Sequence, residues 1–98
     1  MNKSTNAILT IEKELLDSIQ FPKNEVLTEP NLIEDRMAQA KRAMMRGNSP
    51  YNSNVKILFE DKEGKKMVET TVWGVTEKYI LLKRGMSLPL HRIHEIII

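Results

Sequence analysis

The two histidines, His91 and His94, are the side chains of this 98-residue chain with the widest chemical repertoire. An imidazole can ligate a metal ion or exchange protons near neutral pH. In an extended strand, however, residues three positions apart point to opposite faces, so the two rings would converge only if residues 90–92 formed a turn. A catalytic metal usually takes three protein ligands, and the sequence offers no evident third one. We therefore expect no metal site and no catalytic histidine pair.

Other arrangements that support enzyme chemistry are missing from the sequence. The chain has no cysteine, which excludes thiolate nucleophiles, thiolate metal sites and disulfides. No serine stands in a nucleophile elbow, and Gly74 and Gly85 are isolated rather than part of a phosphate-binding loop. The acidic pairs at 34–35 and 60–61 are adjacent in sequence, so their side chains diverge. The sequence predicts a protein that is not an enzyme and needs no cofactor or small-molecule substrate.

The basic side chains offer a better indication of function. The net charge is only +2, but residues 1–29 carry three basic and five acidic side chains, so the remainder of the chain is basic. Its cations fall at the expected end of a helix and at turns, where several of them can gather into a patch for phosphate groups. The candidate nucleic-acid contacts are Lys41, Arg42, Arg46, Lys65, Lys66, Lys83, Arg84 and Arg92.

A simpler interpretation of these cations stays open, because charged hairpin tips are usually only solvated. Acidic residues also alternate with them, at Asp61, Glu63, Glu69 and Glu77. Aromatic side chains would strengthen the nucleic-acid hypothesis if they are exposed, because bases stack on them. The candidates are Tyr51, Trp73 and Tyr79.

Apolar residues suggest a contact with a protein instead. Trp73, the only tryptophan, is expected either to fill the core, which we favour, or to anchor a partner. The terminal run of three isoleucines, 96–98, cannot place every side chain on one face of a strand. At least one must be exposed or meet a second apolar surface. The candidate partner contacts are Trp73, Ile97 and Ile98, and the partner is either another protein or a second copy of the chain.

Helical periodicity marks the first half of the chain. Residues 5–20 have apolar side chains at steps of three and four and end before Pro22, which predicts a helix followed by a connector at 21–29. A second helix is predicted over 31–46, with Pro30 at its start, Asn31 and Glu34 as a capping box, and Gly47 as the C′ residue. Its apolar stripe consists of Ile33, Met37, Ala40 and Met44.

Strand periodicity follows the turn-rich segment 47–54. Alternating apolar residues predict strands at 55–60, 67–75, 79–83, 88–90 and 91–98, with a bulge or bend at Gly74 and an edge position for Pro89. We expect an α+β protein in which one or two N-terminal helices precede a strongly bent antiparallel sheet of four or five strands that forms a small barrel. Residues 1–29 would hold the first helix and connector, and 30–98 a single helix-plus-barrel domain.

The stretch VKILFEDKEGKKMVETTVWGVTEKYILLKRGMSLPLHRIHEI resembles the small barrels of the Sm-like and Src-homology-3-like type. Leu88-Pro89-Leu90 and Arg92-Ile93 stand where such barrels carry an apolar–Pro–apolar step and a basic residue. The outline is similar to the Rho-binding antiterminator type, a small bacterial Sm-like regulator, and to a group of short bacterial proteins that share TTVWGVT and LPLHRI. The resemblance spans residues 30–98. It implies a fold rather than an activity, because the Asp and Asn pattern by which Sm proteins hold uridine is absent.

Composition narrows the class of protein. Hydrophobic residues make up 41% and charged residues 29%, as in globular proteins, and no apolar run approaches the ~20 residues that span a bilayer. Without an export signal or cysteine, the chain is expected in the cytoplasm. The sequence thus predicts a small non-enzymatic binding module that contacts RNA or DNA. The alternative is a protein–protein adaptor or self-associating module that uses a sheet edge and the apolar C-terminal strand.

Overall fold

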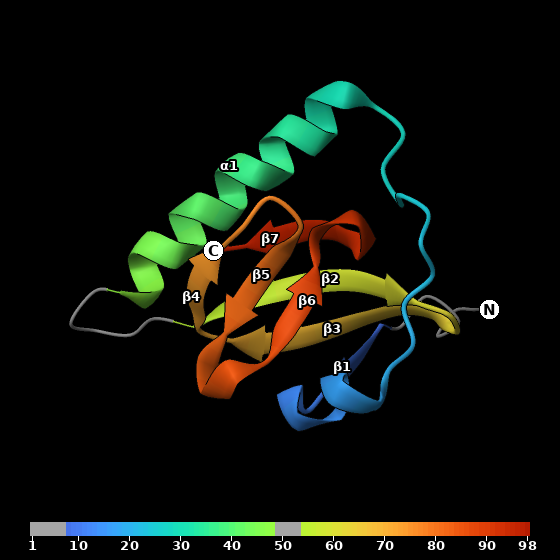
Figure 1. Cartoon of the computed structure of the whole chain (residues 1–98), viewed down its shortest axis with the longest axis horizontal. Helices are drawn as coiled ribbons and strands as arrows, with labels where there is room; N and C mark the ends of the chain where they lie inside the picture. Colours follow the sequence, from blue (N-terminus) through green and yellow to red (C-terminus); the bar gives the residue numbers. More distant parts are fainter. Residues whose placement is uncertain (1–7, 49–53) are drawn as a thin grey trace.

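A computed structural model describes residues 8–48 and 54–98, and within them it contains one α-helix and two β-sheets (Figure 1). The predicted α+β class is therefore confirmed. In chain order the elements are β1 (Leu9–Ile11), the 3-10 helix η2 (Lys13–Ser18), α1 (Pro30–Gly47), β2 (Val55–Asp61), β3 (Gly64–Thr70), β4 (Val72–Val75), β5 (Tyr79–Leu82), the 3-10 helix η3 (Lys83–Gly85), β6 (Ser87–Pro89), the 3-10 helix η4 (Leu90–Arg92) and β7 (Ile93–Ile97).

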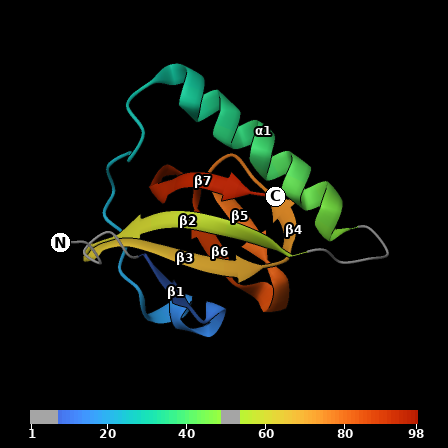
Figure 2. The ribbon, with the colours of Figure 1, turned by 180° about the vertical axis from the view of Figure 1, so that it is seen from behind.

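The two sheets form two layers. One sheet has the strand order β1-β3-β2-β7 and the other β4-β5-β6. The three-stranded sheet lies in front in Figure 1, and Figure 2 shows the four-stranded sheet from the opposite side. The chain passes between the layers at Thr71, where the strand predicted over 67–75 divides into β3 and β4. No hydrogen-bonded ladder joins the sheets within the described residues, so the structure there is not a closed barrel.

The core lies between the layers and follows the predicted alternation of the strands. On β2, Val55, Ile57 and Phe59 are buried while Lys56 between them is exposed. They meet buried side chains of the other layer, including Ile80 and Leu88. Each such side chain contributes roughly 1.5–3 kcal/mol when it leaves water. Pro89 lies in β6, which is an edge strand, as predicted.

Helix α1 begins and ends close to the predicted residues but buries a different face. Of the predicted apolar stripe only Ala40 is fully buried, and the other buried residues of the helix are Arg36, Ala43 and Gly47. Met37 and Met44 are only partly buried beside them. Small side chains occupy this face because the helix backbone lies directly against β4. A Cβ on Gly47 would collide with the carbonyl oxygen of Val72.

Both predicted ends of this helix differ in detail. Gly47 is its last residue and Asn48 the C-cap, with φ −89°, so the glycine serves a close approach rather than a left-handed turn. At the start, Glu29 is the N-cap and makes no side-chain capping bond, so the predicted capping box is wrong. The N–H groups of Leu32 and Ile33 instead donate to the Glu29 carbonyl oxygen.

Helix α1 also covers the free edge of β7. The guanidinium Nη1 of Arg36 donates to the carbonyl oxygen of Ile93 at 3.0 Å, and the N–H of Ile96 donates to the Gln39 side-chain oxygen at 3.0 Å. Because α1 packs on both β4 and β7, it bridges one edge of each sheet (Figure 1).

The helix predicted over 5–20 is wrong. Residues 5–7 lie outside the described part of the chain, and the following residues form β1 and η2. Strand β1 pairs in parallel with β3. The four-stranded sheet is therefore mixed, whereas the sequence predicted an antiparallel sheet. The tertiary contact overrides the helical period, because an isolated short helix is marginal without packing. Leu16 of η2 is buried in the core.

No helix among the described residues is both long and apolar enough to cross a membrane.

Candidate functional site

Two of the predicted nucleic-acid contacts are engaged within the protein. Lys66 Nζ lies 2.5 Å from Asp61 Oδ2 and 3.4 Å from Glu63 Oε1. The hydrogen bond that Lys66 donates to Asp61 raises the pKa of Lys66. Burial opposes ionisation of Asp61, but hydrogen bonds from Lys66 and from the N–H of Glu63 outweigh it and lower the pKa of the Asp61 carboxyl. The Lys66 charge is therefore largely neutralised where it lies.

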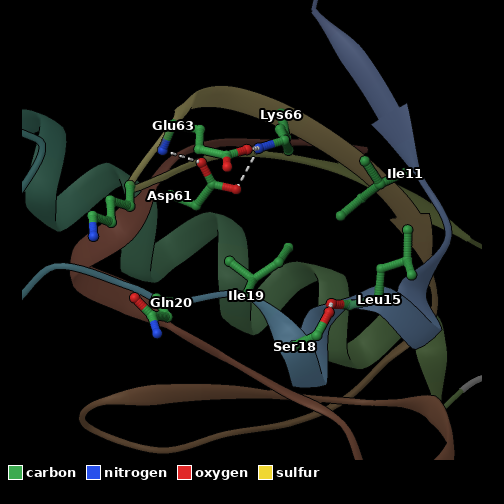
Figure 3. Close-up of a pocket in the computed structure, with 9 residues that line it drawn as sticks. Ile11, Leu15, Ser18, Ile19, Gln20, Asp61, Glu63 and Lys66 are labelled. Carbon is green, nitrogen blue, oxygen red and sulfur yellow. Dashed lines mark hydrogen bonds and ion pairs between the residues drawn. The ribbon is translucent and has the colours of Figure 1, made fainter.

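This ion pair borders a hollow of about 580 Å³ between the N-terminal segment and the β2–β3 hairpin (Figure 3). Ile11, Leu15 and Ile19 form one side of it, and Asp61 and Lys66 lie across from them. The hairpin contributes two cations and two anions, so this hollow has no net charge to attract a phosphate.

Arg92 is the second engaged cation, and it is only 3% exposed. Its Nε donates to the Glu60 carbonyl oxygen at 2.9 Å, and its Nη1 donates to the Asn24 carbonyl oxygen at 2.8 Å. Arg92 thus ties the connector before α1 to β2. It is placed to hold the fold together rather than to face a ligand.

The other predicted cations divide between two ends of the molecule. Lys65 is exposed at the β2–β3 hairpin, which Figure 1 shows at the opposite end from the last turn of α1. Lys41, Arg42 and Arg46 are exposed on α1, and Lys83 and Arg84 are exposed on η3. These two elements are linked through Thr71: its carbonyl oxygen accepts the Lys83 N–H at 3.1 Å, and its methyl group lies beside Gly47.

The most distinctive surface is the outer face of the three-stranded sheet. Trp73, Tyr79 and Leu81 are 50%, 46% and 42% exposed on it. We call these three residues the aromatic face. The expectation that Trp73 fills the core is wrong, whereas exposure of Trp73 and Tyr79 meets the condition set for stacking. Tyr51 lies outside the described residues.

A β-bulge explains why Trp73 faces outward. Val72 pairs with Leu82 and Gly74 with Leu81, so Trp73 is an extra residue between them. The extra residue lets both Val72 and Val75 pack against the core while Trp73 and Gly74 between them turn away. Leu81 then lies over Gly74, where a Cβ would be 3.2 Å from Leu81 Cδ1. The predicted bulge at Gly74 is confirmed, although its effect on Trp73 was not foreseen.

The position of Tyr79 is fixed by the β4–β5 turn. The Thr76 hydroxyl accepts the N–H groups of Lys78 and Tyr79 at 3.2 and 2.9 Å, and the Thr76 N–H donates to the Tyr79 carbonyl oxygen at 2.8 Å. Across the ladder, Tyr79 pairs with Pro89 on β6. The ring therefore stands on a rigid turn, with Lys78 beside it and Lys83 at the far end of β5.

A smaller hollow of about 300 Å³ adjoins the aromatic face at Tyr79. Its other walls include Glu25 and Arg36, a partly buried ion pair in which two Nη–Oε distances are both 2.7 Å. Burial opposes ionisation of Glu25, but the hydrogen bonds from Arg36 and the Leu27 N–H outweigh it and lower the pKa of the Glu25 carboxyl.

The two histidines have different hydrogen-bond partners. His91 Nε2 is 3.0 Å from the Pro22 carbonyl oxygen, whereas His94 Nε2 is 2.8 Å from Glu60 Oε1. Among residues 8–48 and 54–98, no three metal-ligating side chains are grouped to hold a metal ion.

Ile96 and Ile97 alternate as the strand period requires, and Ile98 follows the end of β7. Ile96 is buried, while Ile97 and Ile98 are 41% and 44% exposed. Comparisons of the chain with protein-family models, with curated proteins and with solved structures found no significant match.

Proposed function

We propose that this protein binds single-stranded nucleic acid on the outer face of its three-stranded sheet. One observation carries the proposal: Trp73 and Tyr79 stand half-exposed on an open sheet with cations at both of its ends. Such sheets bind nucleic acid by stacking bases on aromatic rings while the backbone follows basic side chains. The binding would be non-enzymatic, as the sequence predicts.

Stacking favours single strands over duplexes. A base stacked on an aromatic side chain contributes about 1–3 kcal/mol, but the faces of bases within a duplex are already covered by their neighbours. Trp73 on β4 and Tyr79 and Leu81 on β5 offer an exposed apolar surface on a sheet, not an element shaped to enter a groove.

The cations supply the phosphate contacts at the margins of this face. Lys78 is exposed beside Tyr79, and Lys83 is exposed two residues beyond Leu81. Each phosphate that such a side chain neutralises releases counterions, which makes binding depend on salt. The sequence predicted a binding site made of basic side chains at turns and at a helix end. In this proposal the aromatic face is the centre of the binding site, and the cations lie along its margins.

A second candidate, contact with another protein, rests on the exposed Ile97 and Ile98. Pairing through the edge of β7 has less support, because Arg36 and Gln39 already bond to backbone groups on that edge. Protein binding through the isoleucines therefore stays the alternative that the binding experiments must distinguish.

We also infer kinship with the small Sm-like and Src-homology-3-like barrels and a cytoplasmic location. The support for kinship is that α1 precedes the strands, that β3 continues into β4 across a sharp bend, and that the first and last strands of this unit, β2 and β7, pair with each other. A structure determined with its ligand, showing whether further ladder bonds join β4–β6 to the other sheet, tests that kinship.

Fluorescence anisotropy with labelled single-stranded RNA and DNA tests the binding proposal. We expect saturable binding that weakens as salt rises and is lost when Trp73 and Tyr79 are both replaced by alanine. Undetectable binding at low salt to mixed-sequence RNA and DNA would refute it.

A further inference from the structure

We propose that the hollow beside Tyr79 receives one base of the bound strand and selects bases that carry an exocyclic amine over uracil and thymine. This inference rests on the proposed function and adds a sequence preference to it. The residues that carry it are Glu77, Tyr79 and His91, together with the Glu25–Arg36 pair.

The hollow is placed to take a base from the aromatic face. Tyr79 belongs both to that face and to the lining of the hollow, so a base next to one stacked on Tyr79 has a direct way in. Its volume of about 300 Å³ is at the lower limit of ~300–1,000 Å³ for small-molecule pockets, which suits one base and not a base pair. Leu90 supplies an apolar wall.

The hollow is also held in shape by hydrogen bonds around it. The Leu90 N–H donates to the Lys78 carbonyl oxygen at 2.8 Å, which joins η4 to the β4–β5 turn. The Val26 N–H donates to the His91 carbonyl oxygen at 2.9 Å, which joins the connector to η4. A base would thus enter a site whose walls are already positioned.

Glu77 and His91 place hydrogen-bond acceptors in the lining of the hollow, beside the donors of Lys78 and Tyr79. His91 Nε2 faces the carbonyl oxygen of Pro22, which can only accept, so Nε2 carries the proton and Nδ1 of the neutral ring is an acceptor. The exposed carboxylate of Glu77 adds two acceptor oxygens. Arg36 directs three of its five N–H donors to Glu25 and to the Ile93 carbonyl oxygen.

Acceptors of this kind distinguish bases by their exocyclic groups. The N4 amine of cytosine and the N6 amine of adenine are donors, and carboxylates accept from the cytosine amine. Uracil and thymine instead present a carbonyl oxygen at the corresponding position, which a carboxylate repels. Lys78, at the edge of the hollow, suits the phosphate attached to the inserted nucleotide.

Oligo(rC) and oligo(rU) of equal length provide the sharpest comparison, because the two pyrimidines have rings of equal size and differ only at ring positions 3 and 4, where cytosine carries an unprotonated N3 and the N4 amine. At one ionic strength we expect oligo(rC) to bind about tenfold more tightly, the factor for one charge-assisted hydrogen bond. Glu77→Gln and His91→Phe should each reduce this ratio. Glu69→Gln, the same change on the exposed part of β3, should leave it at tenfold.

The outcomes separate this inference from the proposal on which it rests. Equal affinities for the two oligomers, or tighter binding of oligo(rU), overturn the base-selective hollow and leave the aromatic face intact as a binding surface. A preference for oligo(rC) that survives both Glu77→Gln and His91→Phe also overturns it, because the selection then occurs elsewhere. Absence of binding to either oligomer overturns both proposals. Circular dichroism of each variant confirms that the fold is retained.

Discussion

Gly74 lies opposite Leu81 across the β4–β5 ladder, and the register shift just before it leaves Trp73 as an extra residue of the bulge. This local feature of the sequence determines the shape of the candidate site. Because Gly74 has no side chain, Leu81 can lie over it, and the tryptophan beside it turns outward. The aromatic face therefore depends on a backbone irregularity as much as on the aromatic residues.

Two glycine substitutions should have very different effects on stability. Gly47→Ala places a Cβ against the rigid carbonyl oxygen of Val72, so we expect α1 to be forced from β4 at a cost of about 1–3 kcal/mol in the free energy of unfolding. Gly74→Ala meets only the end of the flexible Leu81 side chain, at 3.2 Å, and should cost less. Urea denaturation measures both, and equal losses would contradict the close approach of α1.

Truncating the aromatic face should weaken binding without weakening the fold. Trp73→Ala and Tyr79→Ala should each reduce affinity for single strands about 5- to 150-fold, as loss of one stacking contact of about 1–3 kcal/mol implies. Both residues are about half-exposed, so the melting temperature should change little. Met45→Ala removes a side chain that is 70% exposed on α1 and serves as the control. Anisotropy titration gives the affinities; unchanged values for both aromatic variants would rule out the face.

The dependence of binding on salt should locate the phosphates. Lys83→Ala should reduce the slope of log K against log salt by about 0.7, the value for one phosphate of a single strand. Lys65 is also exposed, but on the hairpin at the other end of the molecule, so Lys65→Ala should leave the slope unchanged (Figure 1). The reverse result would place the strand along the β2–β3 hairpin instead.

Acid should destabilise the protein partly through Glu25. The pKa of this carboxyl is lowered in the folded protein from its ordinary 4.5, chiefly by Arg36 acting against burial. A lowered folded-state pKa stabilises the fold above pH 4.5, and this contribution is lost as the pH falls through the folded-state value. The melting temperature of Glu25→Gln should therefore fall less than that of the unchanged protein when the pH drops below 4.5. Glu69→Gln is the control, and parallel curves for Glu25→Gln and the unchanged protein would contradict the role of the Glu25–Arg36 pair.

The sequence predicted correctly those helices and strands whose hydrophobic periodicity is visible within their own residues. The helix expected over 31–46 is observed at Pro30–Gly47, and the alternation from Val55 to Phe59 gives β2 its buried face. Strand β1 escaped prediction because its partner in β3 lies more than fifty residues away, and nothing in residues 9–11 alone indicates a parallel pairing.

The candidate site was harder to predict from the sequence, because its geometry also depends on contacts between distant residues. Arg92 looks like any exposed cation, yet its partners Asn24 and Glu60 come from distant parts of the chain and hold it in the interior. Trp73 looks like a core residue because its neighbours alternate, and only the bulge at Gly74 reverses its direction. That glycine was the available signal, and Tyr79 was recognised as a candidate only on condition of exposure.

Intrinsic fluorescence tests the central claim most directly, because Trp73 is the only tryptophan in the chain and belongs to the aromatic face. Titration with an unlabelled single-stranded oligonucleotide at low salt should quench its emission with the same affinity that anisotropy reports. The corresponding duplex should quench far less at equal phosphate concentration. Binding without any change in Trp73 emission would contradict stacking on this face, and so would equal quenching by the duplex.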